Sequence, residues 1–324
     1  MKLAELGEFG LINRIAEKVA PSPSVPLGIG DDAAALLPAP GTVTLITSDM
    51  LLEGVHFDLS FCDPQSLGRK SLAVNLSDLA AMGAHPRHFL LGIAIPPRIP
   101  VDFIDLFTAG ILEEAARFEV TLVGGDTCAS QAGLVISITA LGEQRPELVV
   151  KRSGAAAGDL IYLTGTVGDA AAGLRDLRQG VREGFLVQRQ LDPQPRVAAG
   201  VALAEAGLAS AMIDVSDGVL SDLSHICELS RVGARLDLDR LPLSPEYRAS
   251  CGADPFALAL SGGEDYELLF CARKERGGEL QALFESQGLR LTEIGEIVAG
   301  EGVELVTASG SSYAPELRGF DHFG

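Results

Sequence analysis

The pattern of apolar and polar positions predicts a chain in which helices and strands are mixed. Apolar residues recur at helical spacing in 8–19, 65–82, 101–118, 170–177, 219–230 and 278–287. Short apolar runs predict strands at 88–95, 134–141, 159–164, 235–238 and 268–271. These elements do not alternate strictly as strand, helix, strand. The order therefore favours an α+β fold with two domains over a doubly wound parallel sheet.

Several expected strands end in an aspartate. Runs at 27–30, 43–48, 120–125 and 211–213 lead into Asp31, Asp49, Asp126 and Asp214. Adjacent ionised carboxylates repel one another, and Mg²⁺, a hard cation that prefers oxygen ligands, removes that cost. With Asp78 and Asp217, we predict that these acids converge on a site for several Mg²⁺ ions and a nucleotide triphosphate. Aspartates at strand ends and helix N-caps are nevertheless common, so position alone assigns no single one.

Two glycine-containing motifs are candidates for binding phosphate. In Gly124-Gly125-Asp126-Thr127 the glycines leave backbone N–H groups open to a phosphate, although a tight turn with an N-cap fits the pattern equally. The residues 214–218 (Asp-Val-Ser-Asp-Gly) precede an expected helix, whose N-terminus attracts anions, or a metal through the acids. A capping cluster is the alternative for this second motif.

Other candidates are weaker by pattern alone. Residues 261–268 (Ser-Gly-Gly-Glu-Asp-Tyr-Glu-Leu) form a Gly-rich turn with three acids in four positions, and we interpret it as a solvated turn. Arg152 could bind a phosphate with two hydrogen bonds, or be an ordinary surface arginine. By residue type alone, His56 is more often a loop histidine than a substrate contact, and Phe320 is more often a core residue than a ring-stacking contact.

Composition limits the possible partners. The chain has 324 residues, enough for two domains, and the pattern breaks at 143–149, so we place domains at 1–145 and 146–324. A net charge of −19 opposes binding to nucleic acid or to an anionic membrane, and no apolar run is long enough to span a bilayer. Five scattered cysteines without a CxxC spacing predict reduced thiols, which together with the absence of a signal-peptide pattern indicates a cytoplasmic protein.

Several common catalytic motifs are missing from the sequence. The chain contains no P-loop, no nucleophile elbow and no His-Glu-x-x-His, and the glycines at 28 and 30 lack the third glycine of a dinucleotide fingerprint. The candidate chemistry is therefore carried by carboxylates.

The motifs taken together resemble the thiamine-monophosphate kinase family over nearly the full length. The matching strings are Gly-Glu-Phe at 7–9, Gly-Ile-Gly-Asp-Asp-Ala at 28–33, Thr-Ser-Asp at 47–49, Gly-Val-His-Phe at 54–57, Ala-Val-Asn-Leu-Ser-Asp-Leu-Ala-Ala-Met-Gly-Ala at 73–84, Gly-Gly-Asp-Thr at 124–127, Arg-Ser-Gly at 152–154, and those at 214–218, 261–268 and 319–323. Any one string is ambiguous, whereas ten in this order are highly specific.

The resemblance implies a two-domain fold like that of aminoimidazole ribonucleotide synthetase, with N-terminal domains that pair as a β-barrel in a homodimer. Residues 1–145 would be the ATP/Mg-binding and dimerisation domain, and 146–324 an α+β domain. The implied activity is the ATP- and Mg²⁺-dependent phosphorylation of thiamine monophosphate to thiamine diphosphate, with ATP as co-substrate, in the biosynthesis of that cofactor.

The resemblance also implies roles for individual residues, by motif match. The implied Mg²⁺ ligands are Asp31, Thr47, Ser48, Asp49, Asp78, Asp126, Asp214 and Asp217. The implied ATP contacts are Gly125, Asp126, Arg152 and Ser216, and the implied substrate contacts are His56, Glu264 and Phe320. Asp126, Asp31 and Asp217 are the residues expected to matter most for catalysis. The family often has Tyr or Trp where Phe320 stands; stacking survives that change, but a side-chain hydrogen bond does not.

We expect the substrate phosphate to attack the γ-phosphorus of ATP directly, because an ionised phosphate needs no strong base. The barrier is then the meeting of two anions, which aspartate-held metal screens. Two alternatives remain open. One is another ATP-using member of the superfamily, although a selenophosphate synthetase needs a reactive cysteine near the N-terminus and none precedes Cys62. The other is a non-catalytic Mg²⁺–nucleotide-binding module.

Overall fold

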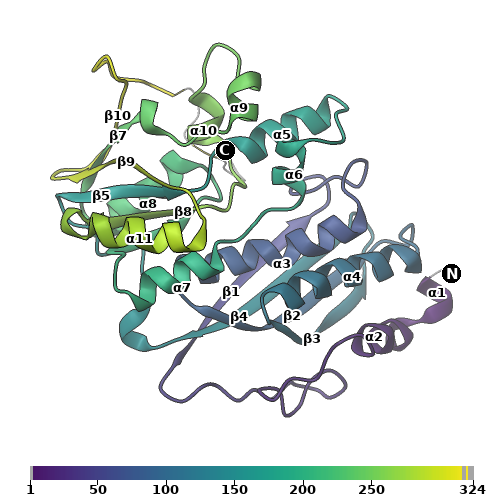
Figure 1. Cartoon of the computed structure of the whole chain (residues 1–324). Coiled ribbons are helices and arrows are strands. Elements are labelled where there is room, and N and C mark those ends of the chain that lie inside the picture. The colour runs from purple at the N-terminus through teal and green to yellow at the C-terminus, as the bar shows by residue number, and fades with distance from the viewer. Residues whose placement is uncertain (1–2, 316–318, 320–324) are drawn as a thin grey trace. The chain divides into compact units, whose positions relative to one another are not determined.

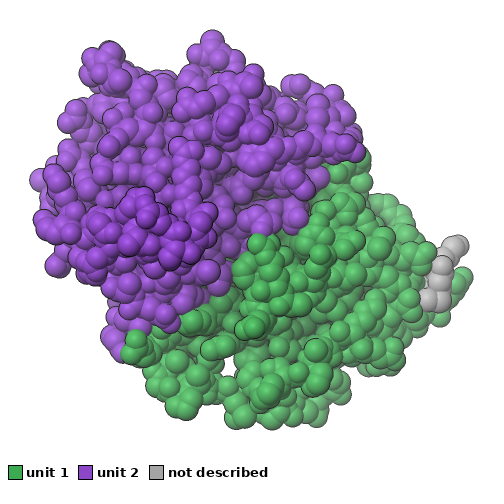
Figure 2. Space-filling model, in the orientation of Figure 1, with its two compact units in different colours: residues 1–79, 85–146 green, residues 80–84, 147–324 purple. Residues whose placement is uncertain are grey.

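The computed structural model describes residues 3–315 and 319, and the chain divides into two compact units (Figure 2). Unit 1 comprises residues 1–79 and 85–146, and unit 2 comprises residues 80–84 and 147–324. The division after Pro146 lies one residue from the boundary placed by sequence. The short segment 80–84 belongs to unit 2, where the Gly200 backbone packs against Ala80 so closely that an added Cβ would lie 2.0 Å from its carbonyl oxygen.

Unit 1 is built on a sheet which, within the described residues, has four strands in the order β1-β4-β2-β3 (Figure 1). Strand β4 is antiparallel to both β1 and β2, and β2 is parallel to β3. The elements are α1 (Leu3–Leu6), α2 (Glu8–Ala16), β1 (Val43–Leu52), α3 (Pro64–Ala81), β2 (His85–Ile95), α4 (Val101–Arg117), β3 (Thr121–Ala129) and β4 (Val135–Gln144). The last two residues of α3 belong to unit 2, as do the last two of the short helix η1 (Pro146–Leu148).

Helices α3 and α4 pack side by side with their backbones in close contact. A Cβ at Gly68 would lie 2.2 Å from the Phe107 carbonyl oxygen, and one at Gly110 would lie 2.0 Å from that of Gln65. Helix α3 begins as the sequence predicts, because Asp63 Oδ1 accepts hydrogen bonds from the backbone N–H groups of residues 65 and 66. Figure 1 shows both helices over one face of the sheet. The opposite face leaves Ile46, Met50 and Leu90 exposed.

Unit 2 contains a sheet which, in the part of the chain that the structure describes, has six strands in the order β10-β7-β9-β5-β8-β6. Its elements are β5 (Asp159–Thr164), α5 (Asp169–Arg178), α6 (Phe185–Leu191), α7 (Val197–Glu205), β6 (Ala211–Asp214), α8 (Val219–Ser230), β7 (Gly233–Asp237), η2 (Leu238–Arg240), α9 (Pro245–Ser250), α10 (Ala257–Ser261), β8 (Leu268–Arg273), η3 (Lys274–Arg276), α11 (Gly277–Gln287), β9 (Leu291–Val298) and β10 (Gly302–Val306). A buried apolar core joins one face of this sheet to α5 and α8. Together the two units give the expected α+β class.

The predicted relation between strand ends and aspartates holds only for Asp214, which ends β6. Asp49 and Asp126 lie inside β1 and β3, which continue beyond them, so the predicted strand ends were wrong. No strand leads into Asp31; the described residues around it form only isolated bridges, Leu27 with Ala35 and Ile29 with Asp31. Each acid interrupts the apolar pattern, but hydrogen bonding to neighbouring strands carries β1 and β3 further.

Strands β9 and β10 were not predicted from the sequence, although β9 lies inside the sheet of unit 2. Two glutamates and Gly295 interrupt the apolar pattern of β9. The glycine is required by packing, because a Cβ there would lie 2.2 Å from the carbonyl oxygen of Arg235 on β7. Within the described part of the chain, no helix combines the length and apolar character needed to cross a membrane.

Candidate active site

Strand β1 and helix α3 bring together three of the predicted metal ligands. Thr47 Oγ1 donates to Asp78 Oδ2 at 2.5 Å, and the Asp49 N–H donates to Asn75 Oδ1 at 3.2 Å. Thr47 and Asp49 are two apart on a strand, so their side chains lie on one face of β1. Asn75 and Asp78 are three apart on a helix and lie on one face of α3, which contacts that face of the strand. Burial, followed by the charge of Asp78, raises the pKa of Asp49 to about 6. Two carboxylates that repel each other in a half-buried place are a favourable position for a cation.

Ser48 points away from this pair, as alternation along a strand requires. Its Oγ donates to the Ile138 carbonyl oxygen at 3.2 Å and lies 3.0 Å from Thr139 Oγ1. Its hydroxyl therefore belongs to the face of the sheet opposite Asp49 and Asp78. If Ser48 binds the same metal ion as Thr47 and Asp49, it must do so through its backbone carbonyl oxygen, because its hydroxyl is on the other face of the sheet.

Asp126 lies apart from the Asp49–Asp78 pair within unit 1. The strand register aligns Met50, Ser137, Gly92 and Asp126 in one row across the sheet. Asp126 is therefore on the edge strand opposite β1, about 14 Å away along the sheet at roughly 4.8 Å per strand. It shares the face of the exposed Met50, the face that Asp49 avoids. The structure thus does not gather these three acids within unit 1.

The remaining candidates of unit 1 lie in loops. His56 Nδ1 accepts a hydrogen bond from the Leu52 N–H at 3.0 Å, so a neutral His56 ring carries its proton on Nε2. Asp31 is exposed, and its Oδ1 accepts from the Asp32 N–H at 2.8 Å. Gly125 packs tightly on β2, because a Cβ there would lie 1.9 Å from the Leu91 carbonyl oxygen. Only glycine fits at this position.

In unit 2 the turn before α8 wraps around a carboxylate that the sequence reasoning missed. Asp222 Oδ2 accepts hydrogen bonds from the N–H groups of Ser216, Asp217 and Gly218 at 3.1, 3.2 and 3.1 Å. Burial, followed by the charge of Asp217, raises the pKa of Asp222 to about 7. Because a side chain of the same helix takes these N–H groups, they are not the free anion site expected from the motif.

The turn before α8 meets the segment 261–268. The Glu264 N–H donates to the Ser216 carbonyl oxygen at 2.8 Å, and a Cβ at Gly263 would lie 2.2 Å from that same oxygen. The Tyr266 N–H likewise donates to the Val215 carbonyl oxygen. The structure therefore brings Glu264 next to the motif that contains Asp214, Ser216 and Asp217, from which it is far apart in sequence.

The Arg152 backbone is fixed between β6 and the C-terminal end of α8, whose N-terminal end carries the turn at 214–218. The Met212 N–H on β6 donates to the Lys151 carbonyl oxygen at 3.0 Å, and Ser230 Oγ donates to the Arg152 carbonyl oxygen at 3.3 Å. The Arg152 side chain is exposed. Its backbone is thus fixed next to β6, whose last residue is Asp214, while its guanidinium faces solvent and can meet an anion.

The interpretation of 261–268 as a solvated turn was wrong. Asp265 and Glu267 are buried, with 1% and 0% exposure. Asp265 accepts from the Gly168 and Ala170 N–H groups at the start of α5, at 2.6 and 3.1 Å. The two acids are tolerated in the core because both carboxylates have hydrogen-bond donors.

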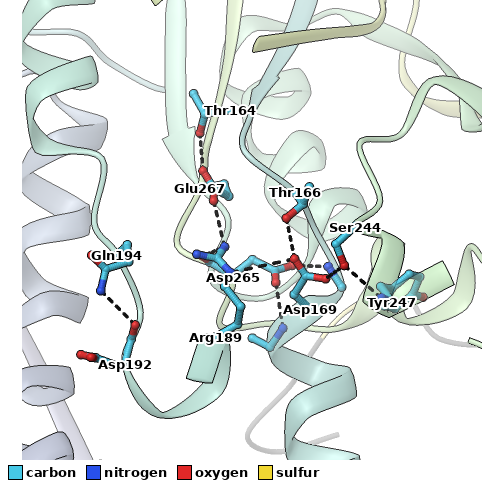
Figure 3. A network of polar contacts seen from close by, with 12 residues as sticks. Thr164, Thr166, Asp169, Arg189, Asp192, Gln194, Ser244, Tyr247, Asp265 and Glu267 are labelled. Atoms are coloured by element: carbon cyan, nitrogen blue, oxygen red, sulfur yellow. Dashed lines mark hydrogen bonds and ion pairs between the residues drawn. The ribbon is translucent and has the colours of Figure 1, made fainter. Parts of the chain in front are cut away.

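Glu267 is held by donors from three places in unit 2. It accepts from Thr164 Oγ1 at 2.7 Å, from Arg189 at 2.8 Å and from Arg196 Nε at 2.6 Å (Figure 3 shows Thr164 and Arg189). Burial alone would raise the pKa of Glu267, but the hydrogen bond and charge of Arg196, with the charge of Arg189, outweigh it and hold that pKa below its usual range. We call Thr164, Arg189, Arg196, Asp265 and Glu267 the anchor network.

The anchor network was not predicted from the sequence, although the position of its two acids next to a strongly apolar strand was a signal for them. Asp265 and Glu267 directly precede strand β8, whose residues 268–272 are all apolar and buried, so acids at these positions lie next to the core. Nothing local identifies the arginines, which lie more than 70 positions from Glu267.

The carboxylates present suit Mg²⁺, although they do not enclose it. Among residues 3–315 and 319, no three His, Cys, Asp or Glu side chains lie close enough to hold a metal ion. The Asp49–Asp78 pair, and Asp214 with Asp217, each provide oxygen donors of the kind that Mg²⁺ takes in small number, the rest of its shell being water and phosphate. Phe320, the last predicted contact, lies outside the described residues.

Comparisons with known proteins show the family to which the chain belongs. Residues 30–144 match the N-terminal domain of the AIR synthase related proteins, and residues 156–308 match their C-terminal domain. Thiamine-monophosphate kinase of Salmonella typhimurium is 41% identical over 327 residues, covering 98% of each chain.

Two solved structures resemble the chain over almost its whole length. Thiamine-monophosphate kinase from Stenotrophomonas maltophilia K279a is 40% identical with a TM-score of 0.85, covering 95% of this chain and 98% of that one. A structure described as AaThiL complexed with AMPPCP and TMP is 34% identical with a TM-score of 0.78, covering 100% and 99%. With two matched domains, full-length identity and a shared fold, the chain belongs to the thiamine-monophosphate kinase family of the AIR synthase related proteins.

Proposed function

We propose that this protein transfers the γ-phosphate of ATP to thiamine monophosphate and so produces thiamine diphosphate. The observation that carries the proposal is the likeness, over the whole chain, to a structure that holds AMPPCP and TMP together. We place the reaction in the cytoplasm, where the five cysteines, none of which forms a disulfide in the structure, remain reduced.

In the proposed mechanism, each of the two units provides Mg²⁺ ligands, ATP contacts and substrate contacts. In unit 1, Asp31, Thr47, Ser48, Asp49 and Asp78 bind Mg²⁺. Asp126, which lies on the other face of the sheet, binds a separate Mg²⁺ ion. Gly125 and Asp126 contact ATP, and His56 contacts the thiamine substrate. In unit 2, Asp214 and Asp217 bind Mg²⁺, Arg152 and Ser216 contact ATP, and Glu264 contacts the substrate, with Phe320 as its ring-stacking partner. Bound Mg²⁺ supplies charge neutralisation for the phosphates.

The chain itself has to position two anions and lower their repulsion. The oxygen that attacks belongs to the substrate phosphate, which is ionised at neutral pH, so no side chain has to remove a proton from it. Its attack on the γ-phosphorus breaks the bond to the β-phosphate oxygen and releases ADP. The exposed Arg152 guanidinium offers paired donors to a phosphate, and the N–H proton of His56 Nε2 is directed away from the backbone contact made by Nδ1.

We also propose that the protein is a homodimer in which unit 1 pairs with its copy as a β-barrel. The support is the uncovered face of the unit 1 sheet, where Ile46 is 66% and Met50 56% exposed. Apolar side chains in neighbouring rows of a sheet gain from a second sheet packed against them. Light scattering after size-exclusion chromatography measures the mass directly, and a monomer at micromolar concentration contradicts this part of the proposal.

A coupled assay of ADP release tests the proposed reaction. Thiamine, thiamine monophosphate and other small phosphate acceptors are compared in the presence of Mg²⁺, with acceptor-free and chelator-treated controls. ADP release that requires both thiamine monophosphate and Mg²⁺ is the expected result. Release with a different acceptor supports another member of the superfamily, and nucleotide binding without turnover supports a non-catalytic module; either result overturns the proposal.

A further inference from the structure

The segment that carries Glu264 is held in a strained backbone conformation. Glu264 and Tyr266 have φ angles of 69° and 50°, a left-handed region that residues with a side chain rarely adopt. Among the described residues only four other than glycine have positive φ, and two of them are here, on either side of Asp265. Such a conformation is unfavourable for a residue with a side chain and persists only where the surroundings enforce it.

The anchor network supplies that enforcement. Strained and buried positions alternate along the segment, because Asp265 and Glu267 are fixed in the core while Glu264 and Tyr266 are only partly buried. Asp265 is tied to the first residues of α5, and Arg189 on α6 donates both to the Asp265 carbonyl oxygen at 3.3 Å and to Glu267. Hydrogen bonds thus fix Asp265 and Glu267, and with them the backbone that carries Glu264.

Helix α6 is itself held rigidly against α5. A Cβ at Gly173 of α5 would lie 2.0 Å from the Leu186 carbonyl oxygen of α6, so the two helix backbones are in contact. Neither helix can shift without breaking this contact or the hydrogen bonds of Asp265. A side chain on α6 can therefore hold a group on the segment in one orientation.

Gln190, the residue after Arg189 on α6, makes such a contact. Its Nε2 donates to Glu264 Oε2 at 2.5 Å, and the Gln190 side chain is buried, with 3% exposure for the residue. Glu264 is the one acid of the segment assigned to the substrate, whereas Asp265 and Glu267 serve the structure. An amide N–H donor satisfies part of the carboxylate and leaves its negative charge in place.

We propose that Gln190 is a positioning residue, whose side-chain amide holds the Glu264 carboxylate in the orientation that receives the cationic, nitrogen-rich part of the substrate. The proposal rests on the proposed function, in which Glu264 contacts thiamine monophosphate. That substrate carries a thiazolium cation and an aminopyrimidine, and a fixed carboxylate can bind either. Fixing the carboxylate before the substrate arrives removes the cost of ordering it upon binding.

The test compares Gln190→Met with the matched control Gln188→Met. Methionine keeps the length of the side chain but loses the amide, while Gln188 lies on the same helix with its side chain exposed. We expect Gln190→Met to raise KM for thiamine monophosphate roughly 10-fold, the usual scale for one hydrogen bond to a charged group. KM for ATP and kcat should stay within about twofold of their wild-type values, as should every parameter of the control.

A double-mutant cycle with Glu264→Gln separates positioning from general support of the fold. If Gln190 acts through Glu264, Gln190→Met adds little to KM once Glu264→Gln is present. Additive effects, or equal increases of both KM values, show a structural role and overturn the inference. Gln190→Asn gives a second test should the Met variant unfold: the shorter amide cannot reach Glu264, so it too should raise KM for thiamine monophosphate alone.

The outcomes distinguish this inference from the proposed function. Wild-type protein without ADP release on thiamine monophosphate refutes the function, and with it the role of Gln190. Wild-type turnover with an unchanged KM in folded Gln190→Met and Gln190→Asn refutes the positioning role alone.

Discussion

Replacement of Glu267 by glutamine should strongly destabilise unit 2. The Glu267 carboxylate is fully buried and is the shared acceptor of Arg189, Arg196 and Thr164. The variant keeps the shape of the side chain but removes its charge. It also places an NH₂ group where one oxygen had accepted hydrogen bonds from cations.

The magnitude follows from the burial of the two arginines. Arg189 and Arg196 side chains are 10% and 21% exposed, so both guanidinium groups would keep a charge in a mostly buried place without its counterion. Removing one partner of a buried ion pair costs about 3–5 kcal/mol. Because Arg196 retains some access to water, we expect the lower end, about 3 kcal/mol. For a unit of this size that lowers Tm by roughly 6–12 °C.

The assay is thermal unfolding at pH 7.5 followed by circular dichroism, with urea unfolding as a second measurement. Glu304→Gln is the control, since Glu304 is 61% exposed and pairs with Arg235 at only 4.0 Å. A pair of that kind contributes at most about 1 kcal/mol. If Glu267→Gln lowers Tm no more than Glu304→Gln does, the buried network does not stabilise unit 2 as argued.

Three further predictions concern unit 1. Asp126→Asn should lower kcat by about 100-fold or more while circular dichroism shows an unchanged fold, because the residue is exposed and its proposed role is electrostatic; near-normal turnover would refute that role. The hydrogen bond from Arg14, with the contribution of Lys18, lowers the pKa of Asp105 to about 2. Its stabilisation of α2 on α4 is therefore complete above about pH 4 and lost as pH falls toward 2. Asp105→Asn should cost about 0.5–1 kcal/mol in urea unfolding at pH 7 and much less near pH 2, and an equal cost at both pH values contradicts the pair. Gly68→Ala should cost about 2–3 kcal/mol, because its Cβ would meet the backbone of α4, and a stability equal to wild type would show that the helices separate freely.

Local patterns were enough to locate most elements of the fold. Helical spacing and Asp63 with Pro64 gave α3 to within a residue at each end, and α8 begins and ends at the predicted residues. These elements are set by interactions within a few positions, namely a helix cap and one apolar face. Strand β9 was not predicted because the reason for its glycine is the close approach of strand β7, which lies beside it in the sheet.

For the candidate site too, local patterns identified some features and the fold decided others. The motifs identified the family and the acidic character of the site, and Asp214 does end its strand. Only the folded chain separates Asp126 from Asp49 by placing them on opposite edges and opposite faces of one sheet. Sequence shows which groups exist, whereas strand order decides which of them can meet.

The sequence by itself determined the class of the fold, most helices and strands, and the family, since each depends on residue type and short-range spacing. The tertiary structure alone decided which acids serve the structure. Three acids stand in four consecutive positions, yet Asp265 and Glu267 are buried while Glu264 is held by Gln190. The physical reason is that burying a charge depends on its partners, and here those partners lie up to 103 positions away in the chain.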